Sequence, residues 1–87
     1  MTYRITLTSS ARRALERDLP ETVATAAWEF ITGALAENPR RVGKPLTGEL
    51  SGFWSARRGT YRVIYAIDDQ VITVTIIRIG HRREVYR

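Results

Sequence analysis

The sequence predicts an α+β fold in which a pair of helices packs on one face of a twisted sheet. Three observations indicate this class: alternating β-formers at residues 3–7, two helical segments at residues 8–19 and 21–38, and strand-like segments at residues 52–58, 60–67 and 71–79. The predicted order is therefore β-α-α-β-β-β, within one domain that spans residues 1–87.

Both helices are recognised by their apolar spacing and by their boundaries. Thr8 or Ser9 can cap the first helix, and Pro20 separates it from the second. The second helix keeps the i, i+3, i+4, i+7 apolar pattern until Asn38-Pro39 stops it. Because only Pro20 joins the helices, we expect an antiparallel hairpin that covers one sheet face and leaves the opposite face open.

The second half of the chain predicts a loop and a three-stranded meander. Residues 40–50 contain glycines and a proline without periodicity, which indicates a loop. Gly59 joins the first two strands, and a tight turn at residues 68–70 joins the last two. Residues 71–79 are apolar on both faces, as expected for an interior strand. From Gly80 onward we expect the tail to leave the sheet.

Positive charge is concentrated in that second half. Residues 1–39 hold four basic and five acidic side chains, whereas residues 40–87 hold ten basic and four acidic ones. Thirteen of the fourteen cationic residues are arginine, whose planar guanidinium group suits phosphate, although a GC-rich genome gives the same bias. The distribution predicts a surface that binds a polyanion.

The composition limits the chemistry that is available. The chain has no cysteine, which excludes disulfides and thiolate chemistry. It has a single histidine, His81, and its carboxylates show no ligand spacing, so we expect no metal and no other cofactor. It has neither a run of about 18 apolar residues nor a signal-peptide block, so we expect a cytoplasmic protein that does not span a membrane.

Strand alternation predicts where the arginines of the meander point. Arg57 shares a face with Phe53 and Ser55, while Arg58 lies on the other face. On the next strand the bulky residues form the better core face, which leaves Arg62 on the open face. These bulky residues are Tyr61, Val63, Tyr65 and Ile67. The structural alternative for Arg62 is an ion pair with one of three carboxylates, Asp68, Asp69 or Glu84.

A cluster of Arg57, Arg62 and Arg82 would bind a phosphate and stabilise the charge that develops when it is attacked. This is the chemistry of metal-free RNA cleavage, in which the 2′-hydroxyl attacks the adjacent phosphorus. His81 is the candidate acid or base, and Tyr86 would stack on a base or orient the hydroxyl. The structural alternatives are a solvated His81 and a Tyr86 that closes the sheet edge.

Several short motifs occur in a specific order along nearly the whole chain. They are the opening strand, the helix pair, Gly43-Lys44-Pro45-Leu46, the run from Gly52 to Gly59, Tyr61-Arg62-Val63-Ile64-Tyr65, Ile67-Asp68-Asp69, and the closing run from His81 to Arg87. In order and spacing these motifs resemble the RelE/ParE superfamily of bacterial toxins, and more closely its RelE-type members.

The resemblance implies a RelE-like fold and a toxin of a type II toxin-antitoxin system that inhibits translation by ribosome-dependent cleavage of messenger RNA. It implies a cognate antitoxin as partner, the ribosome and messenger RNA as targets, and operator DNA as a ligand of the toxin-antitoxin complex. By position, Arg62 matches the arginine that holds the scissile phosphate, and Arg82 and Tyr86 match the C-terminal arginine and tyrosine. Further predicted RNA- or phosphate-binding residues are Arg57, Arg58, Lys44, Arg83 and Arg87.

The chain departs from its relatives at the positions of the proton donor and acceptor. RelE members with two active-face lysines have them where this chain has Phe53 and Ser55, and YoeB-like toxins have a glutamate where Leu46 follows Lys-Pro. The role of acid or base is therefore assigned to His81. Two alternatives are a ParE-like inhibitor of DNA gyrase and a catalytically weak homologue that mainly binds its antitoxin. An acidic antitoxin would cover the arginine face or the helix pair, where Trp28 lies beside the apolar stripe.

Overall fold

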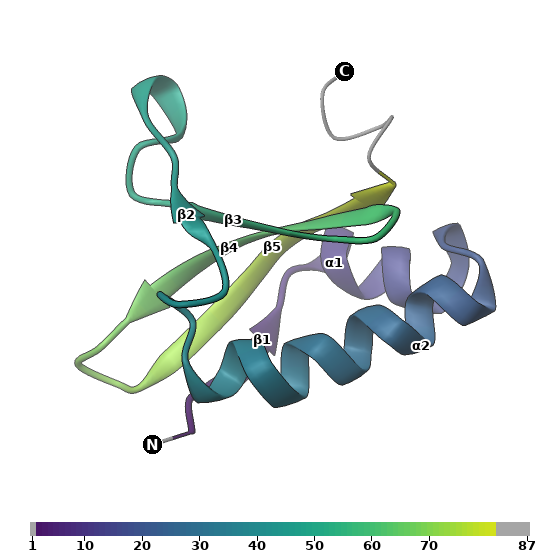
Figure 1. Cartoon of the computed structure of the whole chain (residues 1–87), viewed down its shortest axis with the longest axis horizontal. Helices are drawn as coiled ribbons and strands as arrows, with labels where there is room; N and C mark the ends of the chain where they lie inside the picture. The colour runs from purple at the N-terminus through teal and green to yellow at the C-terminus, as the bar shows by residue number, and fades with distance from the viewer. Residues whose placement is uncertain (1, 82–87) are drawn as a thin grey trace.

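The computed structural model describes residues 2–81, and Figure 1 shows how its helices and strands are arranged. Strand β1 (Arg4–Leu7) leads into α1 (Ser9–Arg13), which continues as the π-helical segment η1 (Ala14–Asp18). Helix α2 (Glu21–Phe30) continues as the π-helical segment η2 (Ile31–Leu35). The remaining elements are β2 (Lys44–Pro45), the 3₁₀ turn η3 (Gly48–Leu50), β3 (Trp54–Arg58), β4 (Tyr61–Asp68) and β5 (Thr73–His81).

The five strands form one mixed sheet in the order β1-β5-β4-β3-β2. Strand β1 is parallel to β5, and the other neighbours are antiparallel. Both helices lie on the same side of the sheet (Figure 1). The predicted α+β class and the helix hairpin on one face are therefore confirmed. The short strand β2 was not predicted, because two residues within a loop carry no periodicity that could reveal it.

Thr8 begins the first helix and also fixes it to the sheet. Its Oγ1 accepts a hydrogen bond from the backbone N–H of Ala11 at 3.1 Å, as an N-cap does, so Thr8 rather than Ser9 is the cap. The same hydroxyl donates to the carbonyl of Ile77 on β5 at 2.6 Å. One side chain thus sets both the start of α1 and its position against the sheet.

The core lies between the helix pair and one face of the sheet. Tyr61, Val63 and Tyr65 of β4 are buried on this face, as strand alternation predicts. Phe30 of α2 packs on Tyr61 with ring centroids 6.5 Å apart. Other buried residues of the core are Ala11, Ala14, Leu19, Ala27, Ile31, Leu35, Ala56, Val74, Ile76 and Ile79. No helix of the described residues is long and apolar enough to cross a bilayer.

Strand β5 is interior, as its apolar faces predict, but its bounds differ from the expected ones. It begins at Thr73, because residues 69–72 form the turn in which Ile72 has a φ of 48°. It continues through Gly80 and His81, which lie opposite Arg62 and Tyr61 of β4. The prediction that the chain leaves the sheet at Gly80 is therefore wrong, since pairing with β4 carries the strand further.

Candidate nucleic-acid interface

A groove of about 540 Å³ lies between the loop before β3 and the open face of the sheet. Among the described residues, five cationic side chains and no carboxylate line this basic groove. The five are Arg41, Lys44, Arg57, Arg58 and Arg62. A concave surface of one charge sign concentrates the opposite charge from solution. The groove is thus suited to a polyanion, as the charge distribution in the sequence predicts.

Two of these arginines are direct neighbours on adjacent strands of the sheet. Arg57 of β3 is the register partner of Arg62 of β4, so both side chains start from the same open face. Arg62 is half-buried, and its Nη1 donates to Oγ of the buried Ser55 at 2.9 Å. Like charges placed directly opposite one another destabilise a sheet, whereas an anion between them would relieve the repulsion.

Arg58 lines the groove, but its guanidinium group does not join the pair formed by Arg57 and Arg62. It starts from the helix-covered face and lies 4.5 Å from the ring centroid of Phe30. Its Nη1 also donates to the backbone carbonyl of Arg57 at 2.8 Å. Of the three hairpin arginines only Arg57 and Arg62 therefore lie together. Arg58 lies on the other face, as strand alternation predicts, and the contact with Phe30 holds it there.

Asp68 and Asp69, at the β4–β5 turn, accept hydrogen bonds from groups other than Arg62. Asp69 accepts two hydrogen bonds from Arg40, at 3.1 and 2.7 Å, and one from the Tyr3 hydroxyl at 2.6 Å. These bonds hold the pKa of Asp69 at about 2, below its ordinary value of 3.8. Asp68 accepts from the backbone N–H of Gln70. Both residues lie at the far end of β4 from Arg62.

The loop that carries Arg41 and Lys44 is held close to the sheet. The hydroxyl of the buried Tyr65 donates to the carbonyl of Pro39 at 2.5 Å, and burial raises the pKa of Tyr65 to about 12. Gly43 passes so close to β3 that a Cβ there would lie 2.8 Å from the Ser55 carbonyl oxygen. Lys44 then pairs with Ser55 in the β2–β3 ladder. These contacts place the basic loop beside Arg57 and Arg62.

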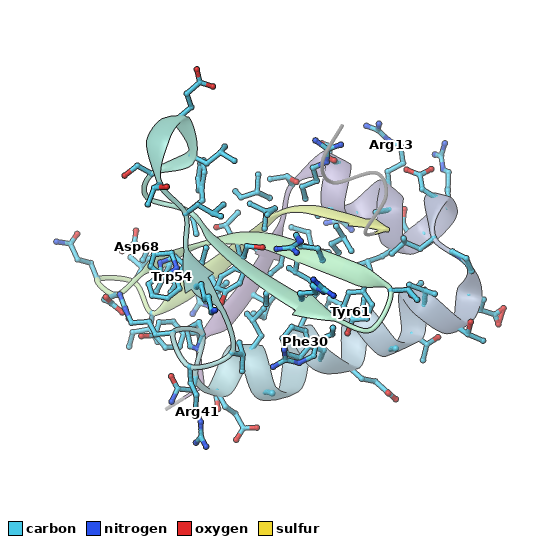
Figure 2. All side chains as sticks on the ribbon, turned by 45° about the horizontal axis from the view of Figure 1, so that its top comes forward. Arg13, Phe30, Arg41, Trp54, Tyr61 and Asp68 are labelled. Carbon is cyan, nitrogen blue, oxygen red and sulfur yellow. The ribbon has the colours of Figure 1, made fainter. Side chains whose placement is uncertain are left out.

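Two cations of this region were missed by reasoning from sequence. Arg41 lies in the loop after α2 (Figure 2). It is one of the residues that line the basic groove. Arg78 is exposed on β5 opposite Ile64, and is therefore on the open face, diagonal to Arg62. A β-bulge at Ile77 shifts the alternation of β5 and moves Arg78 off the face of Ile76. The charge of Arg41 was visible in the sequence, but the bulge was not.

Several predicted site residues lie outside the described part of the chain. These are Arg82, Arg83, Tyr86 and Arg87, together with Glu84 as an ion-pair alternative. For His81 only the backbone is described, opposite Tyr61 at the end of β5. Their roles stay predictions. Among the described residues, no three His, Cys, Asp or Glu side chains lie together so that they could hold a metal ion.

The structure has a helix pair on one face of a mixed sheet and arginines on the other. This is the arrangement expected of the small basic toxins that the sequence motifs indicate. The sequence profile of the ParE toxin of type II toxin-antitoxin systems matches residues 5–86, so the chain belongs to this family. Within the superfamily it is a RelE-type toxin. The relatives named next confirm the resemblance to RelE-type members.

Two curated relatives from Mycobacterium tuberculosis are more than half identical to this chain. Toxin RelG is 51% identical over 87 residues, covering 100% of this chain and 99% of the relative. Toxin RelE is 52% identical over 85 residues, covering 98% and 87%. The crystal structure of the toxin-antitoxin complex RelBE2 of that organism superposes with a TM-score of 0.90 at 50% identity, covering 94% of this chain and 100% of that one.

Proposed function

We propose that this toxin is a ribosome-dependent endonuclease that cleaves messenger RNA and thereby inhibits translation. The observation that carries the proposal is the pair formed by Arg57 and Arg62, which lie opposite one another in a groove where the described part of the chain places five cations and no carboxylate. A phosphate held between the two guanidinium groups would accept hydrogen bonds from both. The relatives RelE and RelG are toxins, which supports the toxin role.

The reaction would break the RNA backbone without an external nucleophile. The 2′-oxygen forms a bond to phosphorus while the bond from phosphorus to the 5′-oxygen breaks, which leaves a cyclic phosphate and a 5′-hydroxyl. Arg62, oriented by Ser55, would stabilise the additional negative charge on the phosphoryl oxygens together with Arg57. The proton leaves the 2′-hydroxyl for a base and reaches the 5′-oxygen from an acid, and His81 is the candidate for one of these roles.

The described cations also indicate a path for the RNA strand. Arg57, Arg62 and Arg78 lie on β3, β4 and β5 and form a diagonal row across the open face. Arg41 and Lys44 flank this row from the loop. A single strand whose scissile phosphate lies at Arg62 would place neighbouring phosphates against Arg78 on one side and the loop on the other. In this proposal the ribosome would hold the strand extended along the row.

The proposed partner in the resting state is a cognate antitoxin encoded beside the toxin. The RelBE2 structure and the archaeal RelE-RelB structure from Pyrococcus horikoshii are toxin-antitoxin complexes of proteins 50% and 29% identical to this chain. An acidic segment of the antitoxin would cover the basic groove and compete with RNA. The resulting complex would bind operator DNA. The free toxin would act on ribosomes in the cytoplasm.

Inhibition of DNA gyrase is the second candidate function, because the matching family profile is that of the ParE toxin. A gyrase inhibitor needs a binding surface but no proton donor or acceptor, and this chain has Phe53 and Ser55 where RelE members have lysines. The two functions predict different consequences in cells. Gyrase inhibition induces the DNA damage response and leaves messages intact, whereas RNA cleavage leaves DNA intact.

Primer extension on transcripts after induction tests the proposal. Wild-type protein is expected to produce new 5′ ends within coding sequences, and Arg62→Ala is expected to abolish them. Arg13→Ala is the matched control, since Arg13 is an exposed arginine of α1 (Figure 2) and does not line the basic groove. Intact messages and normal growth, on expression of folded toxin without antitoxin, would overturn the proposal.

A further inference from the structure

The helix pair carries a second groove, of about 520 Å³, whose character is opposite to that of the basic groove. Its lining includes four apolar residues. Leu15 lies in η1 and Leu19 directly follows it, while Ala24 and Trp28 belong to α2. Trp28 has 44% of its surface exposed, which is unusual for the largest apolar side chain. We name this surface the helix groove.

Glutamates also line the helix groove. They are Glu16, Glu21 and Glu29, and the described residues add no cation to its lining. The arginines of α1 and η1 line a separate depression, with Ser9 and Glu16. Within the described part of the chain, no arginine or lysine nitrogen lies within 4.0 Å of the three carboxylates. The helix groove therefore combines an apolar anchor site with three carboxylates that form no close ion pair to a described residue, in a protein whose net charge is +5.

These charges favour a protein partner over RNA. A phosphate backbone is repelled by three carboxylates, whereas a protein segment can place lysine or arginine opposite them. A large aromatic side chain at the centre of a polar rim is the usual form of an interface anchor. The helix groove lies on the helix layer, which covers one face of the sheet (Figure 1). Strand alternation places Arg57 and Arg62 on the opposite face. Both surfaces can thus be occupied at the same time.

We propose that the helix groove docks a basic amphipathic segment of the antitoxin. An apolar side chain of this segment packs on Trp28 and Leu15, and flanking lysines or arginines face Glu16, Glu21 and Glu29. The inference rests on the proposed function for the identity of the partner. It adds that the antitoxin is polarised, with an acidic segment for the basic groove and a separate basic segment for the helix groove.

Calorimetric titration of the toxin with the full-length protein encoded by the adjacent gene tests this inference. Trp28→Ala and the double variant Glu16→Lys/Glu29→Lys are each expected to weaken binding by at least about tenfold. For the double variant the loss shrinks as salt is raised, because the attraction is electrostatic. Glu49→Lys is the control, since Glu49 is exposed on η3 and lines neither groove, and it is expected to bind like wild type. Circular dichroism confirms that each variant is folded.

Fluorescence gives a second readout at the surface itself. The chain has two tryptophans, so Trp54→Phe leaves Trp28 as the reporter. Addition of the antitoxin is expected to shift the Trp28 emission to the blue as the ring is covered. The inference would be overturned if both helix-groove variants bound the antitoxin as tightly as wild type and the Trp28 emission did not shift. The proposed function would still stand. Loss of ribosome-dependent RNA cleavage in these variants, with antitoxin binding intact, would overturn the inference by assigning the surface to the ribosome.

Discussion

Arg57 lies directly opposite Arg62 in the antiparallel pair β3–β4, and this arrangement places two guanidinium groups side by side on the open face of the sheet. Opposed like charges cost up to about 1 kcal/mol of stability. We expect Arg57→Thr to raise the free energy of unfolding of the free toxin by a few tenths of a kcal/mol or more, while it weakens RNA cleavage. Urea unfolding and a cleavage assay on the same preparation measure both effects.

Arg4→Thr is the control for this exchange. Arg4 is an exposed strand arginine of β1, and its register partner is Thr73 instead of a second cation. It is expected to change neither the stability nor the cleavage rate appreciably. A loss of stability in Arg57→Thr would contradict the view that the two opposed guanidinium groups repel one another.

Ser55 holds Arg62 in position, and its removal should affect activity more than folding. Ser55→Ala deletes the acceptor of the 2.9 Å bond from Nη1 of Arg62. Such a bond to a charged group contributes about 1.5–3 kcal/mol, so we expect a fall in the cleavage rate of about tenfold or more. Ser51→Ala is the control, since Ser51 is exposed in the turn before β3. An unchanged rate in single-turnover cleavage would show that Arg62 needs no such support.

The close approach of Gly43 to β3 predicts a large difference between two glycine substitutions. Gly43→Ala would bring a methyl group against the Ser55 carbonyl and the Tyr65 hydroxyl, so the basic loop must shift. We expect a loss of about 1–3 kcal/mol in the free energy of unfolding. Gly33→Ala, in a helical segment with no atom within 4 Å of the new methyl, is expected to stabilise by up to about 1 kcal/mol. Equal effects in urea unfolding would exclude a tight contact at Gly43.

Asp69 predicts an acid-sensitive contribution to stability. Its pKa is lowered from 3.8 to about 2, first by the hydrogen bonds from Arg40 and then by that from Tyr3. Because the folded-state value is depressed, the stabilisation is fully present above the unfolded-state pKa and is lost as the pH falls through the folded-state value. The difference in urea midpoint between wild type and Asp69→Asn should be constant above pH 3.8 and vanish toward pH 2. A difference that persists at the acid end would contradict this assignment.

The fold was predictable because its elements carry strong periodic signals. The apolar stripe of α2 and the alternation of Tyr61, Val63 and Tyr65 specify which faces are buried. The short connections specify that β3, β4 and β5 pair as a meander, but not that β1 lies parallel to β5. Strand β2 was missed because two residues have no period. The end of β5 was misplaced because Gly80 signals a turn in sequence, although in the structure it is a buried strand residue opposite Arg62.

The candidate site was predictable where strand alternation alone decides which face a side chain points to. The prediction failed where a tertiary contact or a β-bulge changes that arrangement. Arg57 and Arg62 share the open face, as expected from the register of a simple hairpin. Arg58 stacks on Phe30, a contact between distant parts of the chain that no local pattern encodes. Arg78 reaches the open face only through the bulge at Ile77. Local sequence thus predicts strand faces, but not the tertiary contacts that select among the arginines.

Cleavage of a defined messenger RNA by the purified toxin, with and without translating ribosomes, tests the central claim most directly. The proposed function predicts cuts only when ribosomes are present, a 5′-hydroxyl on each downstream fragment, and a loss of rate of about a hundredfold or more in Arg62→Ala. Intact messenger RNA in the presence of ribosomes, together with inhibition of DNA gyrase by the same wild-type preparation, would contradict it.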